Sequence, residues 1–150
     1  MQSCRETEGS FVNEDFPAPE EGMLLTVLLI VEDIDRSRTF YRDVLGATVV
    51  RERDPCVMRF LNSWLIINVG GGPTEDKPEV TMAPPRDPNL TASALNIRVA
   101  DIHAVYGEWR RRGADFLTPP IDRGVEIRCY IRDPDGHLIE VGQTTGLLES

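Results

Sequence analysis

Histidine, cysteine and long apolar runs are scarce in this chain of 150 residues. It contains 2 His and 3 Cys, and the cysteines form no C-x-x-C pair, a usage consistent with a reducing compartment. No apolar run approaches the roughly 18 residues that a membrane-spanning helix needs. We therefore predict a cytoplasmic protein without membrane contact.

Basic residues are also in the minority. The chain has 16 Lys and Arg against 25 Asp and Glu, which gives a net charge of -9 and a pI near 4.7. This charge argues against nucleic acid and anionic membrane surfaces as partners. Aromatic residues make up 7% of the chain, which is few for a protein that binds large aromatic drugs. The apolar content of 41% is ordinary for one soluble globular domain.

The first 22 residues differ from the rest. They carry six acidic side chains against a single Arg5, they include Pro17-Ala18-Pro19, and they show no apolar periodicity. Nor do they show the charged-then-apolar pattern of a signal peptide. We expect a disordered acidic tail over residues 1–22.

The remaining chain contains an internal repeat. Residues 26–34 (TVLLIVEDI) align with 94–102 (ALNIRVADI), and residues 65–70 (LIINVG) align with 137–142 (HLIEVG). An offset of about 70 residues is too long for a solenoid unit and indicates two copies of one small module. We expect a single domain over 23–146, with modules at 23–71 and 92–145 and a linker at 72–91.

Each module is predicted to have the order β-α-β-β-β from its apolar periodicity, helix caps and turn residues. In the first, strands are expected at 24–31, 48–51, 56–61 and 64–69 and a helix at 36–45. In the second, strands are expected at 93–99, 115–118, 125–132 and 137–143 and a helix at 102–112. The Gly-rich start of the linker lacks the Gly-Lys-Ser/Thr ending of a phosphate loop and is expected to be a flexible hinge.

Two segments resemble the vicinal oxygen chelate superfamily, which includes glyoxalase I, extradiol dioxygenases, fosfomycin-resistance proteins and bleomycin-resistance proteins. One is Val31-Glu32-Asp33-Ile34 with Phe40-Tyr41 and Leu45-Gly46, and the other is Asp-Pro-Asp-Gly-His at 133–137 with the strand to 143. The resemblance implies an α+β fold in which two βαβββ modules form a mixed, concave, eight-stranded sheet. It also implies a homodimer, with ligand crevices at the subunit interface as in the bleomycin-resistance binders.

In metal-dependent members, the resemblance implies metal ligands, usually His and Glu, at four symmetry-related positions. Here those positions hold Thr26, Asn68, Ala94 and Glu140. A catalytic divalent site needs about three imidazole or carboxylate ligands, and Glu140 alone supplies one. His103, at a helix start, and His137, after the turn, are not expected to reach the cavity. We therefore predict no cofactor and disfavour a divalent metal.

Strand alternation predicts which side chains line the cavity between the modules. The first module contributes a mainly apolar wall and the second a polar one. The predicted lining is Thr26, Leu28, Trp64, Ile66 and Asn68 from the first module, and Asn96, Arg98, Glu126, Arg128, Tyr130 and Glu140 from the second. Val125, Ile127, Cys129 and Ile131 should face the helix instead.

Three functions remain open at this point. The leading one is a metal-independent binder of a small molecule. The second is a metal-dependent glyoxalase, lyase or dioxygenase that uses Glu140 and unexpected ligands. The third is a metal-free isomerase, epimerase or lyase in which Glu140 or Glu126 is the base and Arg98 or Arg128 stabilises negative charge. Pairing of these Arg and Glu side chains as a purely structural network is an equal alternative to ligand binding. The residues do not identify the ligand.

Overall fold

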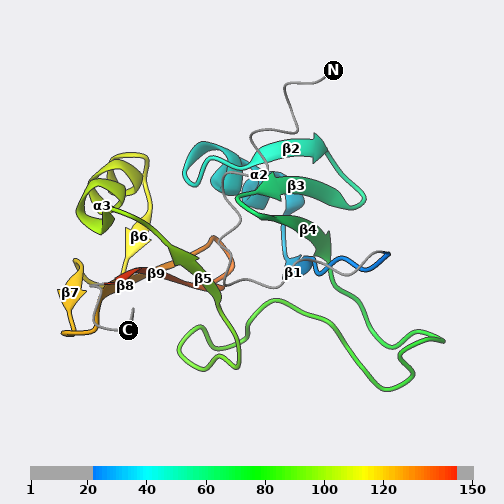
Figure 1. Cartoon of the computed structure of the whole chain (residues 1–150). Coiled ribbons are helices and arrows are strands. Elements are labelled where there is room, and N and C mark those ends of the chain that lie inside the picture. Colours follow the sequence, from blue (N-terminus) through cyan, green and yellow to red (C-terminus); the bar gives the residue numbers. More distant parts are fainter. Residues whose placement is uncertain (1–21, 145–150) are drawn as a thin grey trace.

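The computed structural model describes residues 22–144, and it confirms an α+β fold made of two modules of the βαβββ type, the second with one additional short strand, β7 (Figure 1). The first module contains β1 (Val27–Val31), α2 (Ile34–Asp43), β2 (Thr48–Arg51), β3 (Cys56–Phe60) and β4 (Ser63–Val69). The second contains β5 (Leu95–Arg98), α3 (Ile102–Arg111), β6 (Asp115–Phe116), β7 (Ile121–Asp122), β8 (Glu126–Arg132) and β9 (Leu138–Thr144). The acidic tail, except for its last residue, lies outside the described residues. No helix within 22–144 is long and apolar enough to cross a membrane.

The strands form two sheets rather than the single eight-stranded sheet that we expected. The first has the order β1-β4-β3-β2, and the second has the order β5-β9-β8-β6, with β7 also paired to β8. In each module the first and last strands are parallel and the remaining neighbours antiparallel. β1 and β5 are edge strands of their sheets, and they do not pair with each other in the described part of the chain.

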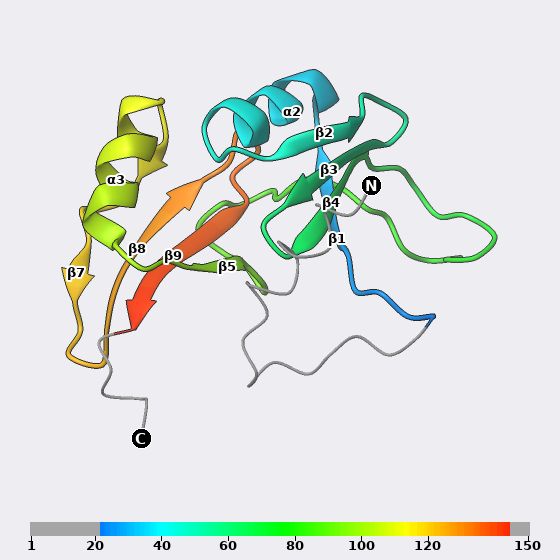
Figure 2. The same cartoon turned by 45° about the horizontal axis from the view of Figure 1, so that its top comes forward.

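The two helices begin and end in the same way, as the repeat predicts. Asp33 and Asp101 are the N-caps, and their carboxylates accept hydrogen bonds from the backbone N–H of Arg36 and Ala104. Gly46 and Gly113, just past the helices, have φ of +85° and +105°, a conformation that glycine adopts without steric penalty. In Figure 2 both helices lie above the strands, with α2 over the first sheet and α3 over the second.

A shared hydrophobic core joins the helix-covered faces of the two sheets. It includes Val31 and Ile67 from the first module and Ile131 and Ile139 from the second, all almost completely buried. These residues have the alternation that was predicted for the helix-facing side, and buried Cys129 shares it. The opposite face of each sheet, here called its open face, therefore carries the residues predicted to line a cavity.

The linker is ordered at its start, where a flexible hinge was expected. Gly71 and Met82 exchange two backbone hydrogen bonds of 2.9 Å, and Thr74 and Lys77 form a second bridge. The backbone passes so close that a Cβ on Gly70 would lie 1.7 Å from the Met82 carbonyl oxygen. This hairpin and the ends of β1 and β4 enclose a cavity of about 220 Å³.

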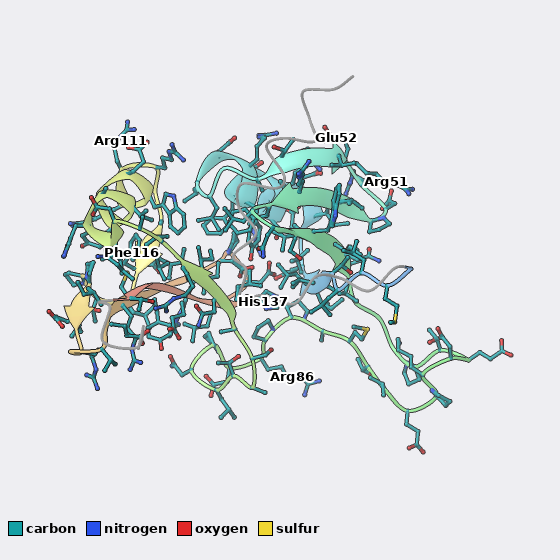
Figure 3. All side chains as sticks on the ribbon, in the orientation of Figure 1. Arg51, Glu52, Arg86, Arg111, Phe116 and His137 are labelled. Atoms are coloured by element: carbon teal, nitrogen blue, oxygen red, sulfur yellow. The ribbon has the colours of Figure 1, made fainter. Side chains whose placement is uncertain are left out.

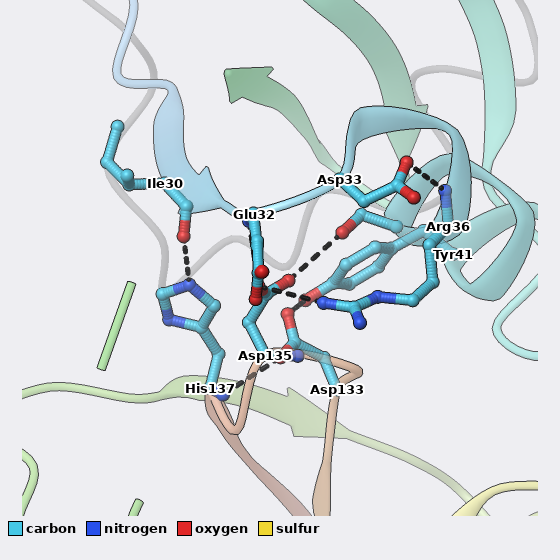
Figure 4. Close-up of polar contacts among 9 residues, drawn as sticks. Ile30, Glu32, Asp33, Arg36, Tyr41, Asp133, Asp135 and His137 are labelled. Carbon is cyan, nitrogen blue, oxygen red and sulfur yellow. Dashed lines mark hydrogen bonds and ion pairs between the residues drawn. The ribbon is translucent and has the colours of Figure 1, made fainter. Parts of the chain in front are cut away.

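The turn at 133–137 joins the two modules (Figure 4). The Asp135 carboxylate accepts hydrogen bonds from the backbone N–H of Glu32 (2.8 Å), from Arg36 Nη2 (3.1 Å) and from Ser37 Oγ (3.2 Å). The Tyr41 hydroxyl donates to Asp133 Oδ2 over 2.8 Å. The most specific sequence motif of the chain therefore holds the second module against β1 and α2.

Asp133 also organises the turn itself. Its Oδ1 accepts from the backbone N–H groups of Asp135 (3.0 Å) and His137 (2.8 Å). Burial raises the pKa of this carboxyl group, against the opposing effects of His137 and of the hydrogen bond from Tyr41. Burial also raises the pKa of the Tyr41 phenol well above its usual range, and the neighbouring Asp133 charge raises it further.

The His137 side chain contacts the other module. Its Nε2 lies 2.7 Å from the Ile30 carbonyl oxygen. Figure 3 shows this residue where the two modules meet. Together with the bond from the Glu32 N–H to Asp135, it satisfies polar groups at the free edge of β1. His137 and Asp135 therefore take the place of a neighbouring strand at this end of the sheet.

Candidate functional site

Five polar side chains form a cluster on the open face of the second sheet. We call it the Arg–Glu cluster, and its members are Arg98, Glu126, Arg128, Tyr130 and Glu140. The Glu126 carboxylate bridges the two guanidinium groups, with 3.0 Å to Arg98 Nη2 and 3.1 Å to Arg128 Nη1. Arg98 Nη1 lies 3.7 Å from Glu140, and the Tyr130 hydroxyl donates to Glu140 over 3.0 Å. The structure thus brings together the charged residues that strand alternation placed on one face.

The sheet register explains why these side chains meet. Tyr130 in β8 lies opposite Glu140 in β9, and Glu140 lies opposite Asn96 in β5. Arg98 and Arg128 both lie opposite Gly142. Side chains of directly opposed residues point to the same face, so three neighbouring strands contribute to one polar patch.

Gly142 makes room for Arg98. A Cβ at this position would lie 2.0 Å from Nη1 and 2.7 Å from Cζ of Arg98, so the guanidinium group lies directly over the glycine backbone. From there Nη2 reaches Glu126 and also donates to Thr144 Oγ1 over 3.2 Å. The missing side chain of Gly142 therefore determines the orientation of Arg98.

The protonation states of the cluster follow from these contacts. Burial alone would raise the pKa of Glu126, but hydrogen bonds from Arg128 and Arg98 outweigh it, so the net pKa lies below the usual range. The pKa of Tyr130 is raised by burial and by its hydrogen bond to Glu140. At neutral pH the cluster thus holds an ionised Glu126 and a neutral Tyr130 that donates to Glu140.

The arginines lie outermost in the cluster. The side chains of Arg98 and Arg128 are 38% and 36% exposed, whereas those of Glu126 and Glu140 are 16% and 19% exposed. A molecule approaching this face therefore meets guanidinium N–H donors first, with the carboxylates beneath them. This arrangement suits an anion or another hydrogen-bond acceptor.

The first-module candidates lie on a different surface. Thr26, Leu28, Trp64, Ile66 and Asn68 are on or beside the open face of the first sheet, and none is fully buried. Among residues 22–144, no hydrogen bond or ion pair joins them to the Arg–Glu cluster. Two cavities within residues 22–144 each belong to one module and its flanking segments. The residues predicted to line one cavity thus lie on two separate open faces, one in each module.

The strand registers also change which first-module residue corresponds to Glu140. Counted back from the helix N-caps, Leu28 in β1 corresponds to Asn96 in β5. Asn96 lies opposite Glu140, whereas Leu28 lies opposite Ile66. The counterpart of Glu140 is therefore Ile66, and the sequence alignment that gave Asn68 was wrong by two residues.

The residues at the metal positions implied by the resemblance do not fit a divalent ion. Ile66 and Ala94 have no donor atoms, and Glu140 already accepts from Tyr130 and faces Arg98. Residues 22–144 contain no group of three or more His, Cys, Asp or Glu side chains placed to share a metal. Carboxylate and imidazole ligands are thus too few at this site to hold a borderline ion.

The two histidines and Asn68 do not supply the missing ligands. His103 is exposed on α3, and His137 contacts the Ile30 carbonyl oxygen. The Asn68 amide oxygen is turned back to accept from the backbone N–H of Val69 over 3.0 Å.

Sequence reasoning missed three residues of the open face of the second sheet, Leu117, Ile121 and Thr144. It also missed the contact between Gly142 and Arg98. Leu117 and Ile121 belong to a broken edge strand interrupted by Pro119 and Pro120, which masked the alternation. Gly142 was placed on the correct face, but its contact with Arg98 depends on the register between β5 and β9. An alternation pattern does not contain that register.

We predict that Gly142→Ala will displace Arg98 while leaving the fold intact. The new methyl group meets the end of a flexible side chain, so the free energy of unfolding should change by no more than about 1 kcal/mol. With Arg98 displaced, Glu126 loses one of its hydrogen bonds and its pKa should rise. Carboxylate NMR titration measures this shift. Gly107→Ala is the matched control, since nothing lies within 4 Å of the added Cβ. An unchanged Glu126 pKa in Gly142→Ala would contradict the assignment.

Comparisons with known proteins place this geometry in a family. The chain is 31% identical over 115 residues to the metallothiol transferase FosB of Shouchella clausii, covering 74% of this chain and 73% of that protein. It is 28% identical over 120 residues to a lactoylglutathione lyase of Haemophilus influenzae, covering 78% and 89%. The crystal structure of a glyoxalase/bleomycin resistance protein/dioxygenase from Nocardioides has the same fold, with a TM-score of 0.66 and 19% identity over 95% of this chain and 93% of that one. A family model matches residues 24–141, and the chain belongs to the glyoxalase/bleomycin resistance protein/dioxygenase superfamily.

Proposed function

We propose that this protein binds a small anionic molecule, without a resident metal, on the open face of its second sheet. The observation that carries the proposal is the pair of outward guanidinium groups held in place by Glu126. A carboxylate beneath two arginines fixes their positions before a ligand arrives, which lowers the entropy lost on binding. Arginine presents planar, paired donors that match a carboxylate or a phosphonate.

The absence of a suitable ligand set supports metal independence. One relative is named a metallothiol transferase and another a lactoylglutathione lyase. This chain has Ile66 and Ala94 at two of the metal positions that the family resemblance implies. We therefore expect that it does not carry out a reaction that depends on a metal at these positions. Elemental analysis of purified protein should find less than one equivalent of Zn, Ni, Mn or Fe. One equivalent that disappears in Glu140→Ala would refute metal independence.

A second copy of the chain would complete the site. The open face of the second sheet is polar, while that of the first carries Leu28, Trp64 and Ile66, so the two faces are complementary halves of an ordinary small-molecule pocket. Within residues 22–144 of one chain, the two faces belong to separate sheets. We therefore infer a homodimer in which the faces of different subunits meet. Sedimentation at micromolar concentration would detect it.

A metal-free acid–base enzyme is the second candidate, and Glu140 is its better base. Two arginines hold Glu126 ionised with a lowered pKa, which makes it a weak proton acceptor. Glu140 is bonded to Tyr130, which could return a proton, and it faces Arg98, which could stabilise developing negative charge. If the protein is such an enzyme, it should convert its bound ligand chemically into a product, and the Glu140→Gln variant should not.

Titration with simple anions tests the proposed function. Inorganic phosphate, methylphosphonate and acetate should each shift amide NMR signals of β5, β8 and β9, with or without a chelator. Arg98→Ala should weaken binding by about 1.5 kcal/mol or more, the lower range for a hydrogen bond to a charged group. Glu126→Leu combined with Arg128→Met removes both partners of an ion pair and should still fold. If this double variant binds the anions as the wild type does, the cluster is structural.

A further inference from the structure

We infer that the apolar strip formed by Leu117 and Ile121 binds the hydrocarbon part of the ligand, so that the ligand is an amphipathic acid. This inference rests on the proposed function, because it places the acid group on the Arg–Glu cluster. Leu117 directly follows β6 and Ile121 is the first residue of β7. These two short strands pair with β8 at the outer edge of the second sheet (Figure 1). The strip is separate from the first-module wall of Trp64 and Ile66.

Backbone pairing places the strip next to the cluster. Ile121 in β7 lies opposite Arg128 in β8. The Leu117 N–H donates to the Tyr130 carbonyl over 2.9 Å, which continues the pairing of β6 with β8. Opposed residues of antiparallel strands share a face, with Cβ atoms about 5 Å apart. Both apolar side chains therefore share the open face with Arg128 and Tyr130.

Both strip residues are large apolar side chains that are about half exposed. Leu117 is 47% exposed and Ile121 is 46% exposed, whereas their neighbour Phe116 packs into the hydrophobic core. On the other side of Arg128 the face is polar, with Glu126, Thr144 and Asn96. The guanidinium group therefore lies at a boundary between an apolar surface and a charged one. A molecule with an acid group and a short hydrocarbon chain matches this boundary.

The dimensions limit the size of the hydrocarbon part. Ile121 is one strand spacing from Arg128, about 5 Å. Leu117 is opposite a residue two positions along β8, a further distance of about 7 Å. A chain of roughly four to eight carbons from the acid group would cover both side chains. Shorter acids would contact Ile121 alone, and bulkier ones would extend past the sheet edge at Pro119.

A homologous series tests the inference. Acetate, butyrate, hexanoate and octanoate, with methylphosphonate and hexylphosphonate as a second arm, would be titrated into the full-length protein by NMR below their micelle concentrations. Affinity should rise about two- to fourfold for each added methylene up to about eight carbons, as expected for partly to fully buried CH₂ groups. The two arms distinguish a carboxylate from a phosphonate as the preferred acid group.

Variants decide where the hydrocarbon lies. Leu117→Ser combined with Ile121→Ser should abolish the dependence on chain length, so that octanoate binds no more tightly than acetate. Val50→Ser, at another exposed apolar position on the edge strand of the first sheet, is the matched control and should retain the dependence. Because these side chains are exposed, the variants should fold.

Each outcome has a distinct meaning. If acetate and phosphate bind but affinity does not rise with chain length, the inference is overturned and the proposed function stands. Chain-length dependence that persists in the double serine variant overturns it too, because the hydrocarbon then lies elsewhere. A double variant that becomes monomeric while the wild type is dimeric would identify the strip as a subunit interface and also overturn it. If no anion of either arm binds, the proposed function fails and the inference falls with it.

Discussion

Replacing Asp133 by alanine should lower the free energy of unfolding by at least about 3 kcal/mol. The carboxylate accepts from the Tyr41 hydroxyl and from two backbone N–H groups, and both Asp133 and Tyr41 are buried. Each donor left unpaired in the interior costs about 1–3 kcal/mol, and the turn that carries Asp135 would lose its anchor. Urea denaturation at pH 7 measures the loss.

Two further variants show whether the loss of stability in Asp133→Ala exceeds that expected when any capping carboxylate is removed. Asp101→Ala removes a carboxylate that caps an exposed helix start, and it should cost only about 1 kcal/mol. Asp133→Asn keeps one oxygen acceptor for the turn and should fall between the two. If Asp133→Ala loses no more stability than Asp101→Ala, the contacts of the turn at 133–137 with the first module contribute little to stability.

Raising the pH from 9 to 11 should remove about 2 kcal/mol of stability through one thiol, Cys129. Burial raises its pKa from 9.0 to about 11. Below pH 9 the thiol is neutral in both states, so this stability is fully present. Between pH 9 and 11 the thiol ionises in the unfolded chain but not in the folded one, so unfolding becomes progressively easier. Tyr41, whose pKa is raised well above 10.0, extends the loss to higher pH.

Denaturation at pH 7, 9, 10 and 10.5 under reducing conditions would measure the slope. Cys129→Ala should be somewhat less stable at pH 7, because it leaves a small cavity, and should lose less stability between pH 9 and 11. Cys56→Ala is a close control, because Cys56 occupies the corresponding buried position in β3 and its pKa is also raised by burial. The expectation for Cys129 fails if the slope of Cys129→Ala equals that of the wild type.

Local sequence patterns were sufficient to predict the main helices and strands and the face of each strand that is buried. The positions of both helices, within two residues at each end, and the burial of Ile131 and Ile139 agree with the sequence pattern. These features depend on residues a few positions apart, where backbone geometry limits the possibilities. Alternation along β8 and β9 also predicted the face on which the charged residues meet.

Local patterns could not give the correct alignment of β4 with β9, the last strands of the two modules. A shift by two residues moves Asn68 to the position of Ile66 but leaves every side chain on the same face, so alternation does not detect it. Pairing with β1 and β5 settles the alignment, and that pairing is a long-range property. The short strand β7 escaped because two residues beside Pro119 and Pro120 show no periodicity.

Contacts between the modules were beyond sequence reasoning for a related reason. The bond from the Glu32 N–H to Asp135 joins residues 103 positions apart, and no local pattern indicates that the two residues meet. The separation of the strands into two sheets has the same origin, since it depends on how the modules pack. The Asp-Pro-Asp-Gly-His segment was correctly identified as a turn, but its part in joining the modules required the structure.

The covered edge of β1 makes the two modules dependent on each other. Although the repeat suggests two equivalent units, the first needs His137 and Asp135 of the second to satisfy Ile30 and Glu32 at its sheet edge. A chain cut within the linker would therefore release a first half with an uncovered strand, the kind of edge that recruits other chains and aggregates. The two halves would be recovered intact only when produced together. Circular permutants that keep both modules would be tolerated, whereas expression of one module alone would not.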